Sequence, residues 1–572
     1  MKKPTIENSQ RTFFNAEDGI VQRIANIITN TAQTIEKAPG RRLEFLACVM
    51  YIICHLIITM MHEPWYDESV AWNIARSASL KEILFSIPHY EGHPPLWHLI
   101  LFPFAKLGTP YELSLNLIAL FFASTACGLI VFKAPFPRII RLLLPFTYFF
   151  FYQYGVVSRP YCMMMLACIL VAMAYKTRDK RPIRYTLTLM FLCLTSAYGI
   201  VLAGGLAMVW VWEIWKLQKL IPFIKGLPHD KRFWCLLTLL VFALLLIAEI
   251  IPSDDTYATV QAENPPSNNF IFCLCYMLFA LPIEASFSSI YISADVIKFV
   301  EIFPPLLFTT SLLGLLFWII VFSWGKTKKM ILPLVVPYLL FSIFAASVYF
   351  YRHHIGIALL FLVFWFWITC EHEEVVPIVH LGIDKISLKN ILLITGTIAM
   401  GVSLYWSISS SIQDILFSYA PGKEDAQFIS EHNLDQYDIM VAWNVYEDDL
   451  ENLDMDINHC RLADNVVPYF NRNIFMNFNN GRDDKNYTTH KVASKDYTEK
   501  CINIWKDKLP EVCFMSPYLE AIYGENVSLE EYYTLVFAPR HNMVWKGVPD
   551  FSQSQIHIRT DLLEDFGLSA IE

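Results

Sequence analysis

The sequence predicts a polytopic α-helical membrane protein of about eleven transmembrane helices, with further juxtamembrane helices and a C-terminal soluble α/β domain. Three observations support this fold class. The 572 residues are 55% hydrophobic and only 17% charged, whereas soluble domains average about 25% charged residues. Apolar residues occur in blocks long enough to cross about 30 Å of hydrocarbon as helices. Basic residues gather between alternate blocks, as expected for cytoplasmic loops.

The chain is expected to divide into three parts. Residues 1–42 are polar and lack an apolar core near the start, so they predict a cytoplasmic N-terminal segment rather than a cleavable signal peptide. Residues 43–411 hold the apolar blocks and form the predicted transmembrane domain. Residues 412–572 hold 28 Asp and Glu against 13 Lys and Arg, and no block there is long enough to span.

Within the acidic C-terminal part, alternating and amphipathic patterns predict a small α/β domain. Residues 438–443 and 534–538 have the composition of buried strands, and residues 424–433 and 496–507 have that of amphipathic helices. The excess of acidic residues argues against a nucleic-acid partner.

Positive charge orients the predicted spans. Arg41 and Arg42 precede the first apolar block, which places the N-terminus in the cytoplasm and His62 outside. The stretch 94–107 is short and contains Pro103 and Lys106, so we interpret it as a juxtamembrane helix on the outer side. Every basic cluster then falls on one side, and 270–283 is a further candidate surface helix. The predicted spans are 43–61, 111–132, 142–157, 161–175, 185–197, 200–215, 234–251, 304–324, 331–350, 355–370 and 391–408.

On this topology the unexpected polar residues gather at the outer side of the membrane. A carboxylate there can act as a general base, and cationic side chains there can hold a phosphate. The candidates are Asp67 and Glu68 in HEPWYDESVAWNIAR, Glu91 and His93 in HYEGHPPLWHL, Arg159 in VVSRPY, and Arg352, His353 and His354 in YFYRHHIG.

Each candidate also fits a purely structural interpretation. The acidic pair can be a solvated turn or a helix N-cap. His93 can cap a helix that starts at the Pro-Pro sequence. Arg159 and Arg352 can be interfacial anchors whose charged ends reach the membrane surface.

Cysteines and nucleotide motifs exclude some other classes. Ten of the thirteen cysteines lie in or beside apolar segments, so they do not suggest a disulfide scaffold. Cys273 and Cys275 lack further ligands nearby, which argues against a metal site. Whether Cys460, Cys501 or Cys513 pair remains open. No GxGxxG, P-loop, HExxH or kinase-like pattern is present, which disfavours a nucleotide-hydrolysing pump.

The sequence WYDES after the first span, followed by YEGHPPLWHLILFPFAKLG, resembles the opening of GT-C membrane glycosyltransferases. The likeness is greatest to the glycosyltransferase family 39-like proteins, which include protein mannosyltransferases and the aminoarabinose transferases of lipid A. It covers about residues 43–200, beyond which only the architecture is similar. The resemblance implies a GT-C fold and transfer of a sugar from a polyprenyl-phosphate carrier to a lipid, glycan or protein acceptor, with inversion, at the outer face.

The resemblance also implies roles for the candidate residues. Asp67 would remove the acceptor proton, Glu68 would position sugar or acceptor, and Glu91 would support the site. The departing phosphate needs positive charge, for which the candidates are Arg159, Arg352, His353 and His354, and His93 is a further candidate for substrate binding. Some relatives carry a second acidic residue where this chain reads SRPYCMMM, which weakens the case for a metal site shared by carboxylates. A divalent metal ion as cofactor is left open.

The expected partners are therefore a polyprenyl-phosphate-linked sugar donor, membrane lipid, and an acceptor glycan, lipid or protein. The expected location is the bacterial inner membrane, with the C-terminal domain in the periplasm. Two other classes fit part of the pattern. A lipid-linked-sugar flippase or a glycan polymerase would be polytopic but would not need the Asp-Glu pair. A non-catalytic anchor would explain the C-terminal domain and none of the polar loops.

Overall fold

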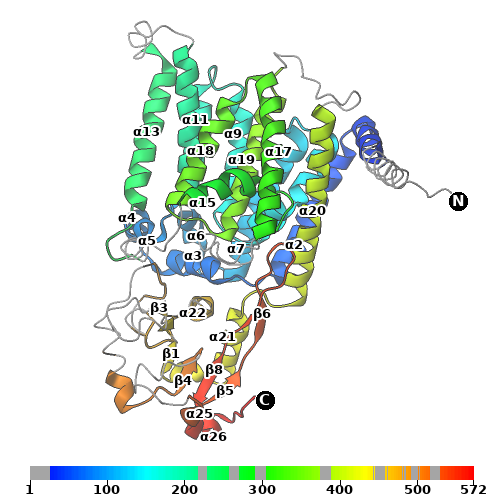
Figure 1. Cartoon of the computed structure of the whole chain (residues 1–572). Helices are drawn as coiled ribbons and strands as arrows, with labels where there is room; N and C mark the ends of the chain where they lie inside the picture. The colour runs from blue at the N-terminus through cyan, green and yellow to red at the C-terminus, as the bar shows by residue number, and fades with distance from the viewer. Residues whose placement is uncertain are drawn as a thin grey trace, which may run out of the picture.

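The computed structural model describes residues 23, 26–216, 229–256, 270–289, 304–373, 388–441, 443–444, 458–459, 462–478, 481, 485–490, 500, 503–515 and 529–571. They form a bundle of helices with a smaller α/β region at one end (Figure 1). Among the described residues, seven helices are long and apolar enough to cross a membrane. They are α2 (Arg42–Met61), α7 (Tyr111–Lys133), α11 (Ala197–Lys216), α13 (Lys231–Ile250), α17 (Pro304–Lys328), α19 (Ile355–Cys370) with the preceding 3₁₀ turn η6 (Arg352–His354), and α20 (Leu388–Leu416). The chain is a membrane-embedded helical protein.

Helices at the edge of the bundle differ from those at its centre. On α13, Leu240, Leu244 and Leu245 are 55%, 55% and 61% exposed. By contrast, α19 is buried along nearly its whole length. Soluble proteins rarely expose continuous apolar surface of this kind, whereas lipid accepts it. The exposed leucines therefore mark a surface suited to hydrocarbon.

Four predicted spans do not form helices of 18 residues or more in the structure. The predicted span 142–157 is broken near Pro145, whose ring interrupts a helix and removes a backbone donor. Its pieces are α8 (Arg138–Leu143), η1 (Leu144–Phe146) and the π-helix η2 (Phe149–Val156). The other three are α9 (Tyr161–Tyr175), α10 (Pro182–Cys193) and α18 (Leu332–Ser347). Every predicted span coincides with helical residues, but the described residues provide seven full-length candidates rather than eleven.

The predicted surface helix at 270–283 is also found as helical pieces. These pack against α17 and α18 and contribute buried side chains, including Tyr276 and Met277, to the main core. The pieces are α15 (Phe270–Cys275), η4 (Tyr276–Ala280) and α16 (Leu281–Glu284). The segment is therefore part of the packed bundle.

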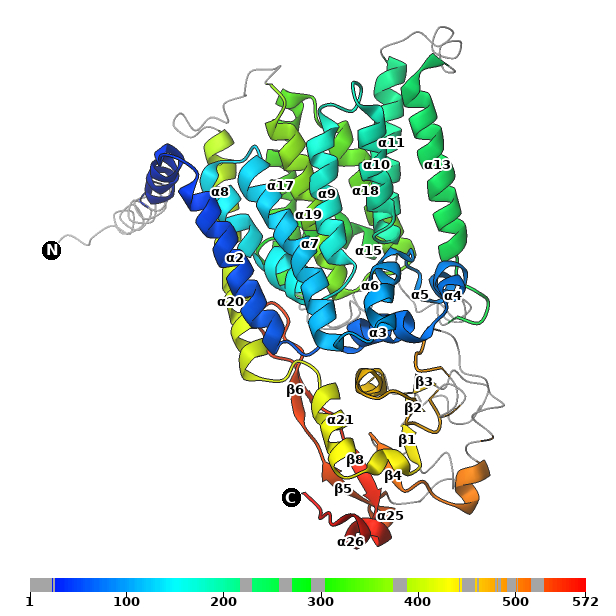
Figure 2. The same ribbon diagram turned by 180° about the vertical axis from the view of Figure 1, so that it is seen from behind.

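The start of α2, α8 and the start of α13 lie at the bundle end that faces away from the α/β region (Figure 2). Arg138 forms an ion pair with Glu44 at the start of α2, with 2.6 Å between Nη2 and Oε2. Arg232 at the start of α13 pairs with Asp179 after α9 at 3.1 Å. Basic segments far apart in the sequence thus share one end of the bundle, as the charge pattern predicts.

Short helices gather at the opposite end, next to the α/β region: α3 (Tyr66–Ser77), α4 (Leu80–Phe85), α5 (Ile87–Glu91) and α6 (Leu96–Lys106) (Figure 1). With 11 residues, α6 is about 16 Å long, which is too short to cross a membrane. It packs Trp97 and Leu101 against Trp72 and Ala75 of α3. The stretch 94–107 is thus a short helix at this end, as predicted.

The C-terminal α/β region is built on a mixed four-stranded sheet with strand order β1-β4-β8-β5. β1 (Ile439–Val441) is parallel to β4 (Val512–Phe514), and β8 (Ile556–Arg559) is antiparallel to β4 and to β5 (Tyr533–Phe537). Ile439, Val512 and Ile558 pack in one core with Ile429 of α21 (Gly422–Glu431). The other elements are η7 (Leu434–Gln436), β2 (Trp443–Asn444), β3 (Asn458–His459), α22 (Leu462–Val466), η9 (Val467–Tyr469), α25 (Leu529–Tyr532), β6 (Arg540–Asn542), β7 (Phe551–Gln553), η10 (Thr560–Leu562) and α26 (Leu563–Phe566).

The local predictions for this region agree with the structure where it is described. The predicted strands at 438–443 and 534–538 coincide with β1, β2 and β5, and the predicted helix at 424–433 coincides with α21. Of the predicted helix at 496–507, residues 503–507 are helical, and 496–499 and 501–502 lie outside the described residues.

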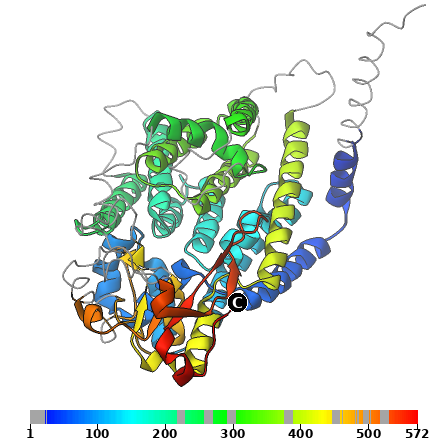
Figure 3. The same ribbon diagram turned by 60° about the horizontal axis from the view of Figure 1, so that its bottom comes forward.

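The α/β region and the bundle are joined more closely than the predicted boundary suggests. α20 continues to Leu416, so a boundary at residue 411 falls inside a helix, because the helix outlasts its apolar run. In addition, Arg76 of α3 donates hydrogen bonds to the backbone carbonyls of Val467, Pro468 and Phe470 at 3.0–3.1 Å. Figure 3 shows the two parts in contact at this end.

Candidate functional site

Asp67 and Glu68 occupy the first turn of α3. Carboxylates are favoured at a helix N-terminus, where unpaired backbone N–H groups point outward. The Glu68 side chain turns back and accepts a hydrogen bond from the backbone N–H of Trp65 at 3.1 Å. The capping role considered for the acidic pair is therefore found in Glu68.

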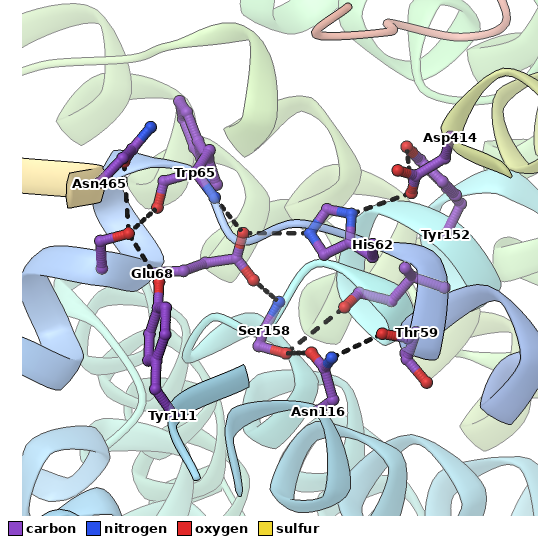
Figure 4. Close-up of polar contacts among 12 residues, drawn as sticks. Thr59, His62, Trp65, Glu68, Tyr111, Asn116, Tyr152, Ser158, Asp414 and Asn465 are labelled. Carbon is purple, nitrogen blue, oxygen red and sulfur yellow. Dashed lines mark hydrogen bonds and ion pairs between the residues drawn. The ribbon is translucent and has the colours of Figure 1, made fainter. Parts of the chain in front are cut away.

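Glu68 lies at the centre of a buried polar network (Figure 4). Its Oε1 accepts the backbone N–H of Ser158 at 2.5 Å, and its Oε2 lies 3.2 Å from Nε2 of His62. The Glu68 side chain is fully buried, and both oxygens are engaged by the protein. The expected contact of Glu68 with sugar or acceptor does not fit this arrangement. Glu68 instead fixes the turn that carries Arg159.

His62 connects Glu68 to the last long helix. Its Nδ1 lies 2.9 Å from Oδ2 of Asp414 in α20, 352 positions away in the sequence. The hydroxyl of Tyr152 donates to the same Asp414 oxygen at 3.0 Å. Burial disfavours the charged imidazole, but the carboxylates of Asp414 and Glu68 outweigh it and raise the pKa of His62 well above its usual value. His62 is thus a cation shared by two buried carboxylates.

Asp67 has a different environment from its neighbour. Its Oδ2 lies 2.8 Å from Nη2 of Arg159, and the two side chains are 20% and 11% exposed. Arg159 follows η2 and precedes α9, where Pro160 stands at a position that needs no backbone donor. Burial disfavours the charge on Arg159, but the Asp67 carboxylate raises its pKa above the usual value. The structure therefore pairs the predicted base with a predicted phosphate ligand.

Aromatic rings enclose the Arg159 guanidinium. It lies 5.4 Å from the ring centre of Trp65 and 5.2 Å from that of Tyr161. Three donors around it have no hydrogen-bond partner among the described residues: Nη1 of Arg159, Nε1 of Trp65 and the hydroxyl of Tyr161. All three residues are at most 9% exposed. A buried donor without a partner costs about 1–3 kcal/mol, so this cluster suits a ligand rich in acceptor oxygens.

The segment at Arg352 meets the same aromatic cluster. The ring of Tyr161 lies 5.8 Å from that of His353 and 5.9 Å from that of His354. Nδ1 of His354 accepts the backbone N–H of Tyr351 at 2.9 Å, so this ring is neutral in the observed arrangement. The expectation that His354 supplies positive charge is therefore not supported.

Arg352 itself faces the C-terminal region. Its guanidinium lies 5.6 Å from the ring centre of Trp545, and its Nη1 lies 3.4 Å from Oδ2 of Asp550. Arg159 contacts the ring of Tyr161, which in turn lies 5.8 Å from that of His353, the residue next to Arg352. That the two arginines bind one phosphate stays a prediction.

Glu91 and His93 complete the predicted set. Oε1 of Glu91 lies 3.3 Å from Nδ1 of His490 in the C-terminal region. His93 has a buried Nδ1 without a partner among the described residues. Burial, followed by the charge of Arg159, lowers the pKa of His93 to about 4. His93 is therefore neutral near pH 7 and can act only as a neutral hydrogen-bonding group.

The described residues provide no group of three or more His, Cys, Asp or Glu side chains that could hold a metal ion. Asp67 is paired with Arg159, and Glu68 is bound by backbone donors and His62. This arrangement does not fit a site of shared carboxylate ligands. Cys273, Cys275 and Cys513 are free thiols, and Cys460 and Cys501 lie outside the described residues.

Sequence reasoning missed His62 and Asp414. His62 directly follows the first apolar block, and Asp414 lies in the last turn of α20, beyond the last block. A buried carboxylate near the end of an apolar helix is a recognisable signal of a polar site. The predicted boundary at residue 411 assigned Asp414 to the acidic domain, so it was not considered as a residue of the membrane part.

A scan against protein-family models finds no match for this chain, and searches of the curated proteins and of the solved structures find none either. The contacts and charges of the site are thus the basis for its function.

Proposed function

We propose that this chain is a membrane glycosyltransferase of GT-C type that moves a sugar from a polyprenyl-phosphate carrier to a lipid, glycan or protein acceptor. One observation carries the proposal. Asp67 and Arg159 form a partly exposed pair at the bundle end, beside buried donors that have no partner among the described residues. A carboxylate that can accept a proton, beside a cation that can hold a phosphate, is the chemistry that such a transfer requires.

In the proposed reaction, the acceptor hydroxyl attacks the anomeric carbon from the side opposite the phosphate. The bond between that carbon and the phosphate oxygen breaks, and the polyprenyl phosphate leaves with the bonding electrons. Asp67 takes the hydroxyl proton, and Arg159 stabilises the charge that develops on the phosphate. Before substrate binds, Arg159 neutralises Asp67. Binding of the phosphate draws Arg159 away and leaves Asp67 as a free base.

The aromatic side chains support this assignment. Trp65 and Tyr161 flank Arg159, and each has a donor without a partner in the part of the chain that the structure describes. A sugar offers hydroxyl and ring oxygens as acceptors, and aromatic residues with one polar end are suited to a membrane boundary. Glu68, His62 and Asp414 have no reacting role in this scheme, and they hold the Ser158–Arg159 turn in place.

The proposal includes a topology of eleven crossings, with the basic end in the cytoplasm and the C-terminal region in the periplasm. The clustered basic residues support this orientation through the positive-inside rule. It requires the interrupted segment α8–η1–η2 and the short helices α9, α10 and α18 to cross as well. Cysteines introduced at the exposed Lys180 and Asp507 should react with a membrane-impermeant thiol reagent from opposite sides. Reaction of both from one side would contradict the topology.

The activity is tested with purified protein in lipid nanodiscs and polyprenyl-phosphate sugars extracted from bacterial membranes. Wild type should release polyprenyl phosphate, and intact-mass analysis of the glycolipid or glycan products should show one added sugar. Asp67→Asn keeps the side-chain volume but removes the proton acceptor, so turnover should fall about 100-fold or more. The matched control is Asp507→Asn, which changes an exposed carboxylate in the C-terminal region and should leave turnover unchanged.

Other outcomes would identify the alternative classes. If wild type moves the carrier across the membrane without releasing phosphate, the protein is a flippase. If it extends a chain of repeat units, it is a polymerase. If neither carrier nor sugar changes, and Asp67→Asn equals wild type in every assay, the protein is a non-catalytic anchor.

A further inference from the structure

The hairpin of β6 and β7 reaches from the C-terminal region into the bundle. Its connecting residues 543–550, here called the hairpin tip, extend along α20 (Figures 1 and 3). Val544 and Trp545 belong to the main hydrophobic core of the bundle rather than to that of the α/β region. The tip is thus a piece of the C-terminal region embedded in the transmembrane part.

The hairpin tip is held firmly on two sides. Gly547 donates its backbone N–H to Ser410 at 2.9 Å, and its carbonyl accepts from Gln413 at 2.7 Å. Gly547 has φ of +78°, and a Cβ there would lie 2.8 Å from the Cβ of Ser409, so this close approach to α20 requires glycine. The backbone of the tip is therefore fixed against α20.

Lys546 anchors the other side of the tip. Its Nζ lies 2.8 Å from Oε1 of Glu284, and both side chains are fully buried. It also donates to the carbonyls of Glu284 and Ser288 at 2.6 and 2.8 Å, and it lies 4.6 Å from the ring centre of Trp406. A buried charge is retained only where partners compensate for lost water. These contacts lock the tip to α16.

With the hairpin tip held in this position, Trp545 lies beside Arg352. The Trp545 ring packs against Tyr148, which precedes η2, and Phe149 of η2 at 5.7 and 6.1 Å, and Arg352 lies 5.6 Å from its centre. Trp545 is 6% exposed, and its Nε1 has no partner among the described residues. A buried, unpaired N–H next to a guanidinium is a combination that suits an anion.

Asp550, at the end of the tip, faces the same guanidinium. Its Oδ2 lies 3.4 Å and 3.5 Å from the two terminal nitrogens of Arg352. These distances exceed the 2.7–2.9 Å typical of strong charged hydrogen bonds. Asp550 is 58% exposed, and exposed ion pairs are weak. A phosphate monoester, with three terminal oxygens and up to two charges, would form shorter bonds to Arg352.

We propose that the hairpin tip forms one wall of the carrier-phosphate site, with Trp545 as donor and stacking surface and Asp550 as an internal anion that a prenyl phosphate displaces from Arg352. The choice of a prenyl phosphate as the ligand rests on the proposed function. The hairpin tip makes the C-terminal region a part of the site rather than an independent module. Trp545 is a binding residue in this scheme, and Lys546 is a positioning residue.

Binding of farnesyl monophosphate to the purified full-length chain tests the proposal, with farnesol as the uncharged control. Asp550→Asn removes the competing charge at nearly constant size, so affinity for farnesyl monophosphate should rise about two- to fivefold. Trp545→Phe keeps a ring but removes the N–H donor, so affinity should fall about tenfold. Farnesol binding should not change in either variant, and Asp507→Asn should bind both compounds as wild type does.

The outcomes separate the two proposals because this assay needs no sugar transfer. Wild-type affinity in Asp550→Asn overturns the role of Asp550, and wild-type affinity in Trp545→Phe overturns that of Trp545. Equal changes for farnesol and its phosphate would show a general disturbance of the lipid site and would also overturn the inference. The expected binding pattern without any sugar transfer would contradict the glycosyltransferase and leave a prenyl-phosphate site. Failure of wild type and Asp550→Asn to bind would overturn both.

Discussion

Asp67 and Glu68 are neighbours in the sequence but belong to two different kinds of site. Glu68 is fully buried, and each of its oxygens has a protein partner. Asp67 is 20% exposed and pairs with Arg159, whose second terminal nitrogen has no partner among the described residues. Successive residues on a helix point about 100° apart, so one acid turns into the protein and the other toward the membrane boundary.

The difference is between a fully buried network with several protein partners and a partly exposed pair beside donors that have no partner among the described residues. In the network of His62, Glu68 and Asp414, one imidazolium lies between two buried carboxylates, and its removal leaves both carboxylates without a charged partner. One atom of this network, Oδ1 of Asp414, has no hydrogen-bond partner among the described residues. Around Asp67 and Arg159, several donors still lack an acceptor. Unpaired buried donors are costly, and a bound substrate would relieve that cost. We therefore assign chemistry to the second network and positioning to the first.

The largest expected effect comes from breaking the first network. His62→Gln removes the cation between two buried carboxylates, so it should lower the free energy of unfolding by about 3–5 kcal/mol. Guanidinium unfolding in detergent measures this change. The matched control is His229→Gln at an exposed position near the basic end of the bundle, and it should change the stability by less than about 0.5 kcal/mol.

The pH dependence shows whether charge is the cause. The pKa of His62 is raised in the folded protein, from about 6.5 in the unfolded chain. Its stabilising contribution is therefore complete below pH 6.5 and is lost as the pH rises through the folded pKa. The difference in stability between wild type and His62→Gln should shrink as the pH is raised above 6.5. A difference that is constant from pH 6 to pH 10 would show that His62 acts by packing alone.

Hydropathy and charge were sufficient to predict most of the bundle. Apolar blocks are local signals, and each predicted span coincides with helical residues. The break at Pro145 changed the form of one span but not its place. Two features of the fold could not be predicted from hydropathy and charge. α20 extends past its apolar run to Asp414, and the hairpin tip inserts from a region whose composition is that of a soluble domain.

For the candidate site, the sequence predicted which residues lie at the same membrane face but not which side chains contact one another. The alternation of basic loops placed Asp67 and Arg159 at one membrane face, and the structure joins them at 2.8 Å. The topology predicted from the sequence could not distinguish Asp67 from Glu68, because the orientation of each side chain depends on what packs against α3. The topology also could not predict the contacts of His62 with Asp414 or of Arg352 with Trp545. Those contacts join distant segments and leave no local pattern in either one.

The smallest expected effect comes from substituting Arg352, which lies at the edge of the second network. Arg352 presents a planar guanidinium to Trp545 and two nitrogens to Asp550. Lysine keeps the charge but cannot stack in the same way or bind a phosphate through two parallel hydrogen bonds. Arg352→Lys should therefore weaken use of the carrier about three- to tenfold, seen as a higher KM for the carrier with little change in kcat. Arg352→Ala should weaken it further.

An anchor at the membrane boundary would behave differently from a phosphate ligand. A lysine reaches the interface nearly as well as an arginine, so a pure anchor predicts wild-type kinetics for Arg352→Lys. Arg184→Lys is the matched control, because Arg184 is exposed on α10 at the opposite end of the bundle. It should leave both KM and kcat unchanged. If Arg352→Lys also matches wild type in both constants, Arg352 is an anchor, and the ligand-binding network ends at Tyr161.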